Sequence, residues 1–221
     1  MKAELSNLLQ RTNSFKQIVL LLLLLIPFSS QANQPPTVLV LGDSISAGFG
    51  IPVQRGWVNL LQNKLQGPIP DVKVINASVS GETTSGGLSR LPALLDQHQP
   101  DLLIIELGGN DALRGTPLKI IRRNLESMID KAEHLGVMVM LLGMQLPPNY
   151  GPVYNTGFSG MYESLSLERD TLVVPFLLEG IATEPGMMQS DGIHPTVPAQ
   201  PLMADMVFEA MDIWVEFTTM L

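Results

Sequence analysis

Five short apolar runs, separated by segments with helical spacing, restrict the folds that this sequence can adopt. The runs span Thr37–Leu41, Val72–Asn76, Leu102–Leu107, Val137–Leu142 and Leu172–Val174. Most of them are continuous rather than alternating, which is typical of parallel strands covered on both faces. Strands that alternate with helices predict a three-layer α/β/α sandwich with a five-stranded parallel sheet.

The segments between the runs carry apolar residues three and four positions apart, as helices do. The predicted helices span Trp57–Leu65, Leu88–Gln97, Leu118–Leu135, Met161–Arg169 and Pro201–Phe217. The last of these is rich in methionine, which indicates core filling rather than a cofactor site. The sequence shows no internal repeat or low-complexity tract.

The first 32 residues differ from the rest of the chain. Three basic residues precede the apolar run Ile18–Phe28, and the small residues Ser30 and Ala32 follow it. This order is typical of a secretory signal peptide. We predict cleavage after Ala32, a single domain over residues 33–221, and a location in the periplasm or outside the cell. The alternative is an uncleaved membrane anchor, but a spanning helix needs about 20 apolar residues.

Charge and cysteine content exclude several classes of function. The formal charge is -8, and removing residues 1–32 makes it more negative, so the protein does not attract nucleic acid. The chain has no cysteine, so it forms no disulfide, has no thiol chemistry and carries no lipoprotein anchor. Asp43, Asp111 and Asp191 have one histidine near them, which is a poor zinc set. We therefore expect no metal, no cofactor, no stable membrane anchor after cleavage, and a monomer.

Polar and glycine-rich stretches follow the first three predicted strands, where binding sites of parallel sheets form, and a fourth stretch precedes the last predicted helix. They are "GDS" at 42–44, "NASVSGETT" at 76–84, "ELGGND" at 106–111 and "SDGIHP" at 190–195. Each stretch alone is compatible with a helix cap or a turn. Gly-Asp-Ser occurs by chance in roughly one 200-residue chain in twenty.

Together these stretches supply the groups that acyl transfer requires. A serine needs a base within hydrogen-bonding reach, and histidine is the usual one. The histidine needs an acceptor, and the oxyanion needs fixed donors. Ser44, His194 and Asp191 can supply the first three groups. The other two histidines, His98 and His134, lie at predicted helix ends on the far side of the sheet.

The four stretches, in this order, resemble the four blocks of the SGNH hydrolases, also called the GDSL family. The blocks are "GDSIS", "ASVSGETT", "GGND" and "DGIHP", and the resemblance covers essentially all of residues 33–221. "GLSRLPALLDQHQPD" and "IIELGGNDALRG" look particularly like the bacterial periplasmic thioesterase/lysophospholipase/protease branch of this family. The resemblance implies a flavodoxin-like sandwich and a serine hydrolase.

The resemblance also implies a role for each residue of the site. Ser44 would be the nucleophile, His194 the base and Asp191 its orienting partner. The Ser44 N–H, the Gly81 N–H and the Asn110 side-chain amide would form the oxyanion hole. Gly81 has no Cβ, so substrate can approach its backbone closely.

The expected substrates are small-molecule acyl esters, acyl thioesters and lysophospholipids, as the resemblance implies, together with simple acetyl and aryl esters. The apolar, proline-containing segment Met144–Tyr154 is expected to be a loop beside the site. Leu113, Leu146 and Met187 are candidates to line an acyl groove, although ordinary loop packing explains them equally well. Two other functions stay open: an SGNH esterase that deacetylates carbohydrates, and a binding module that keeps the fold without catalysis.

Overall fold

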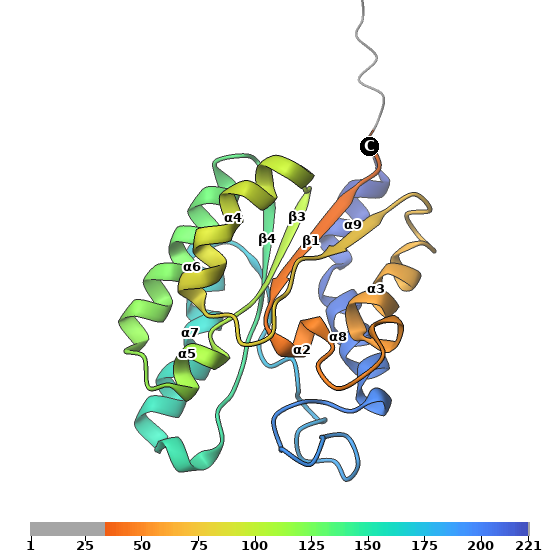
Figure 1. Ribbon diagram of the computed structural model, residues 1–221. Coiled ribbons are helices and arrows are strands. Elements are labelled where there is room, and N and C mark those ends of the chain that lie inside the picture. Colours follow the sequence, from red (N-terminus) through yellow and green to blue (C-terminus); the bar gives the residue numbers. More distant parts are fainter. Residues whose placement is uncertain (1–33, 221) are drawn as a thin grey trace, which may run out of the picture. The chain divides into compact units, whose positions relative to one another are not determined.

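A parallel sheet of five strands carries the fold, in the order β2-β1-β3-β4-β5 (Figure 1). The strands are β1 Thr37–Gly42, β2 Lys73–Asn76, β3 Leu102–Glu106, β4 Met138–Leu142 and β5 Leu172–Val174. The computed structural model describes residues 34–220, so the predicted signal peptide at residues 1–32 lies outside the described residues. The predicted five-stranded parallel sheet is confirmed, and its order is that of flavodoxin-like folds.

The central strands are apolar throughout because both of their faces are buried. Every residue of β1 and β3 is buried. Along β3, Leu102 and Ile104 pack into one core, whereas Leu103 and Ile105 pack into the other. The strand β2 lies at an edge of the sheet and is more exposed.

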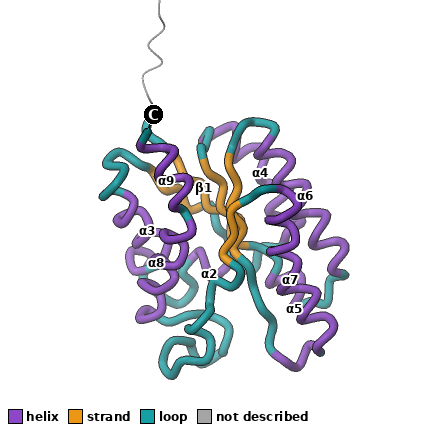
Figure 2. The backbone as a smooth tube through the Cα atoms, turned by 180° about the vertical axis from the view of Figure 1, so that it is seen from behind, coloured by secondary structure: helices purple, strands orange, loops and turns teal. Residues whose placement is uncertain are grey.

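Helices cover both faces of the sheet, as the tube in Figure 2 shows from behind. On one face lie α3 Trp57–Leu65, α8 Gln200–Ala210 and α9 Asp212–Thr219; on the other lie α4 Thr84–His98, α6 Leu118–Glu133 and α7 Pro152–Arg169. The short elements are α2 Ser44–Ala47, α5 Gly109–Leu113, η1 Val53–Arg55, η2 Pro148–Tyr150 and η3 Val197–Ala199. The predicted three-layer sandwich is confirmed. Within residues 34–220, no helix combines the length and the apolar character needed to cross a bilayer.

Two helices begin earlier than predicted. α4 begins at Thr84 rather than Leu88, because the Thr83 hydroxyl accepts the Gly86 N–H at 3.2 Å and caps the helix. α7 begins at Pro152, well before Met161. Proline suits the first helical position since it needs no N–H there. The end of the segment that was predicted to be a loop is therefore helical.

The predicted C-terminal helix is two helices. The chain bends at Met211, whose φ of -91° and ψ of 1° end α8 and begin α9. Met211 and Trp214 are both buried, so the bend lets the two helices pack on the same core. The sequence has no glycine or proline at this point. The core-filling role of the methionines is confirmed by Met203 and Met211.

The strand order reverses between β1 and β3, which places the ends of these two strands side by side. Gly42, the last residue of β1, is in register with Glu106, the last residue of β3. The segments that follow these two strands therefore leave the sheet together. In open α/β sheets this reversal is the usual place of a binding site.

Candidate active site

Ser44 is the first residue of α2, a single helical turn at the end of β1 (Figure 1). The Asp43 carboxylate caps this turn by accepting the Ile45 N–H at 3.0 Å. Gly48 ends the turn in the left-handed conformation, with φ of 75°. Ser44 is half-buried, and the strand β1 that precedes it is fully buried. The serine is therefore attached to the rigid core and is partly accessible to solvent.

The side chains of Ser44, His194 and Asp191 form a continuous hydrogen-bonded chain. His194 Nε2 lies 2.8 Å from Ser44 Oγ, and His194 Nδ1 lies 2.7 Å from Asp191 Oδ2. An ionised carboxylate only accepts hydrogen bonds, so Nδ1 carries the proton and Nε2 is left free to accept the serine O–H. The structure thus joins residues that are 150 positions apart in the sequence.

One tight turn fixes both Asp191 and His194. Asp191 Oδ1 accepts the N–H groups of Ile193 at 2.9 Å and His194 at 3.0 Å. Gly192, between them, has a φ of 67°, which favours glycine. The hydrogen bond from the His194 side chain, followed by those from the two backbone N–H groups, lowers the pKa of Asp191 to about 2. Asp191 is therefore charged at neutral pH.

Contacts of Gln189 and Phe49 hold the turn of residues 191–194, called the histidine turn, against the segment that follows α2. Gln189 donates its side-chain N–H to the Phe49 carbonyl at 2.8 Å, and its backbone N–H to the His194 carbonyl at 2.8 Å. The Phe49 ring lies on the imidazole of His194, with 4.5 Å between ring centroids. The sequence does not single out Gln189 and Phe49, because nothing distinguishes them from other loop residues until the two loops meet.

The candidate oxyanion donors are the backbone N–H groups of Ser44 and Gly81 and the side-chain amide of Asn110. Asn110 in α5 donates one side-chain N–H to Asp43 Oδ2 at 2.9 Å, which leaves its second N–H available. Gly81 is exposed with a φ of 80°, and a Cβ added there would meet nothing within 4 Å. Within residues 34–220, the N–H groups of Ser44 and Gly81 donate to no backbone carbonyl outside helices and strands. These three donors suit a negatively charged oxygen.

A buried polar cluster ties the loop of Gly81 to the loop of Asn110. The Asp111 carboxylate accepts the Thr84 N–H and the Thr84 hydroxyl, each at 2.8 Å. Asn124 donates to the same hydroxyl at 3.0 Å. These three side chains are buried, so their bonds are shielded from water. The cluster keeps the two loops at a fixed separation.

The candidate acyl-lining residues do not belong to one apolar cluster. Leu146 packs on the core that contains α6 and α7, whereas Met187 packs on the opposite core. They therefore lie on opposite sides of the sheet. Leu113 is half-buried, and its carbonyl accepts the Tyr150 hydroxyl at 3.3 Å.

The remaining histidines lie away from Ser44, as predicted. His98 is the last residue of α4 and His134 caps the end of α6. In the part of the chain that the structure describes, no three histidine, aspartate or glutamate side chains are placed to hold a metal ion. The absence of a metal and of a cofactor stays a prediction.

The sequence family is decided by comparison with known proteins. Residues 40–200 match the family model described as "GDSL-like Lipase/Acylhydrolase family". The chain belongs to this family. It is 50% identical over 182 residues to "Esterase TesA" of Pseudomonas aeruginosa, covering 82% of this chain and 90% of that protein. It is 42% identical over 183 residues to "Thioesterase 1/protease 1/lysophospholipase L1" of Escherichia coli K12, covering 83% and 86%.

A solved structure agrees with this family. The crystal structure of TesA matches with a TM-score of 0.77 and 50% sequence identity, over 80% of this chain and 98% of that one. The SGNH-type fold and the resemblance drawn from the four sequence blocks are confirmed. This GDSL-family protein is a serine hydrolase, so the alternative of a binding module without catalysis is rejected.

Proposed function

We propose that this GDSL-family hydrolase cleaves fatty-acyl esters and acyl thioesters, with Ser44 as nucleophile, His194 as general base and Asp191 as the residue that orients the base. The proposal rests on one observation. The hydrogen-bonded chain from Ser44 Oγ through His194 to Asp191 has links of 2.8 and 2.7 Å. This is the arrangement that makes a serine hydroxyl nucleophilic.

In the first half of the reaction, the acyl group passes from the substrate to Ser44. His194 Nε2 takes the hydroxyl proton while Ser44 Oγ attacks the carbonyl carbon. The N–H groups of Ser44 and Gly81 and the free amide N–H of Asn110 receive the charge on the carbonyl oxygen. When the tetrahedral intermediate collapses, the imidazolium donates its proton to the leaving alcohol or thiol, and the acyl group remains on Ser44.

In the second half, water releases the acyl group. His194 Nε2 accepts a proton from water, which attacks the acyl-enzyme, and the carboxylic acid leaves as Ser44 recovers its proton. Asp191 stabilises the imidazolium in both halves. Its pKa of about 2 means that it does so as a carboxylate across the neutral range.

The substrate class is supported by the relatives and by the loops around the site. One relative is named an esterase, and the other a thioesterase, protease and lysophospholipase. We assign lysophospholipids and aryl esters to this chain as further substrates. Leu113, Leu146 and Met187 would line the acyl site. A carbohydrate deacetylase is the competing function, and the apolar segment at residues 144–151 disfavours it.

The same proposal includes the cellular setting. After cleavage behind Ala32 the protein would act as a monomer in the periplasm or outside the cell, without a membrane anchor. It would bind no nucleic acid and need no metal. The acidic charge of the chain supports the absence of nucleic-acid binding.

The test is hydrolysis of p-nitrophenyl and coenzyme A esters from acetyl to palmitoyl by the wild type and by Ser44→Ala. Loss of the nucleophile is expected to lower kcat about a million-fold. Ser89→Ala, at an exposed serine of α4, is the matched control and should keep full activity. Near-normal activity of Ser44→Ala would overturn the proposed mechanism. A strong preference for acetylated sugars over the long-chain esters would favour the deacetylase instead.

A further inference from the structure

A fully buried carboxyl group lies directly behind the turn that carries Ser44. Glu106, at the end of β3, has no exposed surface. Its Oε2 accepts the N–H of Asp43 at 3.1 Å, the N–H of Ser46 at 3.3 Å and the hydroxyl of Ser46 at 2.6 Å. The residues on both sides of Ser44 are therefore held by one oxygen atom. Nothing in the proposed reaction uses this group.

The carboxyl group of Glu106 fits beside the backbone of Gly42 because glycine has no Cβ. A Cβ added to Gly42 would lie 2.7 Å from Glu106 Oε2 and 2.7 Å from the Ser46 side chain. Any larger residue at Gly42 would push the carboxyl group away from the turn. The absence of a side chain at Gly42, in the "GDS" stretch, therefore allows Glu106 to reach the turn that follows.

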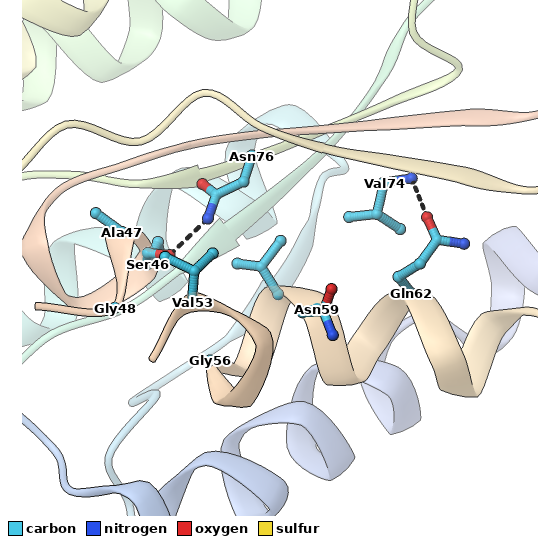
Figure 3. A pocket seen from close by; sticks show the side chains of 10 residues that line it. Ser46, Ala47, Gly48, Val53, Gly56, Asn59, Gln62, Val74 and Asn76 are labelled. Atoms are coloured by element: carbon cyan, nitrogen blue, oxygen red, sulfur yellow. Dashed lines mark hydrogen bonds between the residues drawn. The ribbon is translucent and has the colours of Figure 1, made fainter. Parts of the chain in front are cut away.

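A cavity also borders this turn. A cavity of about 110 Å³ lies beside Ser46, Ala47 and Gly48 (Figure 3). On that side the hydrogen bond from Asn76 Nδ2 to the Ser46 carbonyl, at 2.8 Å, fixes the turn (Figure 3). Because α2 is only one turn long, its position depends on these side-chain hydrogen bonds rather than on an extended packed face.

We propose that Glu106 is a positioning residue, which holds the Asp43–Ser46 turn so that Ser44 Oγ stays within reach of His194 and the carbonyl carbon. This inference rests on the proposed role of Ser44 as nucleophile. Glu106 hydrogen-bonds the backbone N–H groups of Asp43 and Ser46, so it acts on Ser44 through the backbone on either side of it. A misplacement of about 1 Å is enough to cost roughly 100-fold in rate.

The charge of Glu106 is not what the turn requires. Burial, and then the nearby Asp43 carboxyl, raise the pKa of Glu106 well above its ordinary value, which disfavours the charged form. Its second oxygen, Oε1, has no hydrogen-bond partner within the described chain. All three hydrogen bonds to the turn go to Oε2, so one acceptor oxygen at that position serves them, and a glutamine side chain can supply it.

The experiment compares Glu106→Gln, which keeps an acceptor oxygen, with Glu106→Met, which has a similar length and no oxygen. Each is assayed on a p-nitrophenyl ester well below its Tm, and the rate of Ser44 labelling by a phosphonate is measured in parallel. We expect Glu106→Met to lose about 100-fold in kcat and in labelling rate, with KM within about threefold of the wild type. Glu106→Gln should keep kcat within about fivefold.

Ser166→Ala is the matched control for stability. It removes a hydrogen bond of 2.7 Å from a buried side chain to the Thr171 carbonyl, far from the site, and should lower Tm without changing kcat. If Glu106→Met does not fold, Glu106→Asp provides the same test. It keeps a carboxyl group but withdraws it by one methylene, and the same loss of kcat is expected.

Two results would overturn the inference. One is a wild-type kcat for folded Glu106→Met or Glu106→Asp. The other is equal damage in Glu106→Gln and Glu106→Met, since the acceptor oxygen would then be irrelevant. Ser44→Ala is measured in the same assays, so that a failure of this inference can be told apart from a failure of the proposed function. If Ser44→Ala is inactive and Glu106→Met is fully active, only the role of Glu106 fails.

Discussion

Asp191 Oδ2 and His194 Nδ1 lie 2.7 Å apart within a single turn of four residues. The same carboxylate accepts two backbone N–H groups of that turn through its other oxygen. The orientation of the imidazole is therefore set locally, before the turn meets the rest of the site. The rest of the fold brings this turn close to Ser44. Gln189 and Phe49 hold it there.

Asp191→Asn should lower kcat/KM by up to about 10⁴-fold across the neutral pH range. An amide in place of the carboxylate permits the wrong tautomer of His194 and no longer stabilises the imidazolium. The measurement is kcat/KM from pH 5 to 9. Asp96→Asn, at an exposed carboxylate of α4, is the control and should match the wild type. A variant at Asp191 with wild-type rates would show that His194 needs no orienting partner.

His194→Ala should be as inactive as Ser44→Ala, and the double variant should be little worse than either. The two side chains act as one unit, so removing the second costs almost nothing once the first is gone. The measurement is the residual rate of the three variants on one activated ester. Losses that multiply in the double variant would mean that Ser44 and His194 act independently, despite the 2.8 Å between them.

Asn110→Ala should lower kcat about 10²–10³-fold and leave KM nearly unchanged. Its free amide N–H meets full negative charge only in the tetrahedral intermediate, so its loss affects the transition state rather than substrate binding. Asn63→Ala, at an exposed position of α3, is the control. A variant at Asn110 that raised KM alone would make this residue a substrate contact.

The sheet was predictable, and candidate site residues could be chosen, because their signals are local. Continuous apolar runs identified β1 and β3, and the four polar stretches contain the candidate site residues Ser44, Asn110 and His194. Glu106 stood inside one of those stretches, yet its burial behind Ser44 depends on the pairing of β1 with β3. The apolar runs alone do not reveal that pairing, which follows only from the flavodoxin-like strand order that the family resemblance implies.

The bend at Met211 was missed for a different reason. No glycine or proline interrupts the apolar pattern there, so local propensity favours one continuous helix. The bend results from packing, because Met211 and Trp214 both reach the core that α3 and α8 share. The link from Gln189 to Phe49, 140 positions away, likewise appears only when the loops meet.

Gln189→Ala should lower kcat about fivefold and destabilise the fold by about 1–2 kcal/mol. The side chain makes two hydrogen bonds, to the carbonyls of Phe49 and Pro195, and the net worth of such a bond is about 1 kcal/mol. Its loss loosens the histidine turn against α2. The measurements are kcat and chemical denaturation, with Gln97→Ala at an exposed position as the control. If Gln189→Ala lowered the free energy of unfolding and left kcat unchanged, the role of Gln189 would be structural only.

Asp43→Asn should stabilise the protein relative to the wild type as pH rises. Burial raises the pKa of Asp43 from 3.8 to about 6, against the opposing effect of hydrogen bonds, the first from the Ile45 N–H. Because the folded-state pKa is the higher one, the unfolded state ionises first, and the free energy of unfolding falls as pH rises from about 4 through 6. The full effect of this one carboxyl is up to about 3 kcal/mol.

The variant lacks this titration, although its amide oxygen can still accept a hydrogen bond from the Ile45 N–H or from Asn110. The difference in free energy of unfolding, variant minus wild type, should therefore grow by up to about 3 kcal/mol between pH 4 and pH 7. Urea denaturation at several pH values measures it, with Asp96→Asn as a control that should show no such growth. A constant difference would mean that Asp43 ionises as easily in the folded protein as in the unfolded chain. A growing difference would show that ionisation of Asp43 lowers the stability of the wild type. The charged Asp43 carboxylate is the acceptor that lies 2.9 Å from the amide nitrogen of Asn110.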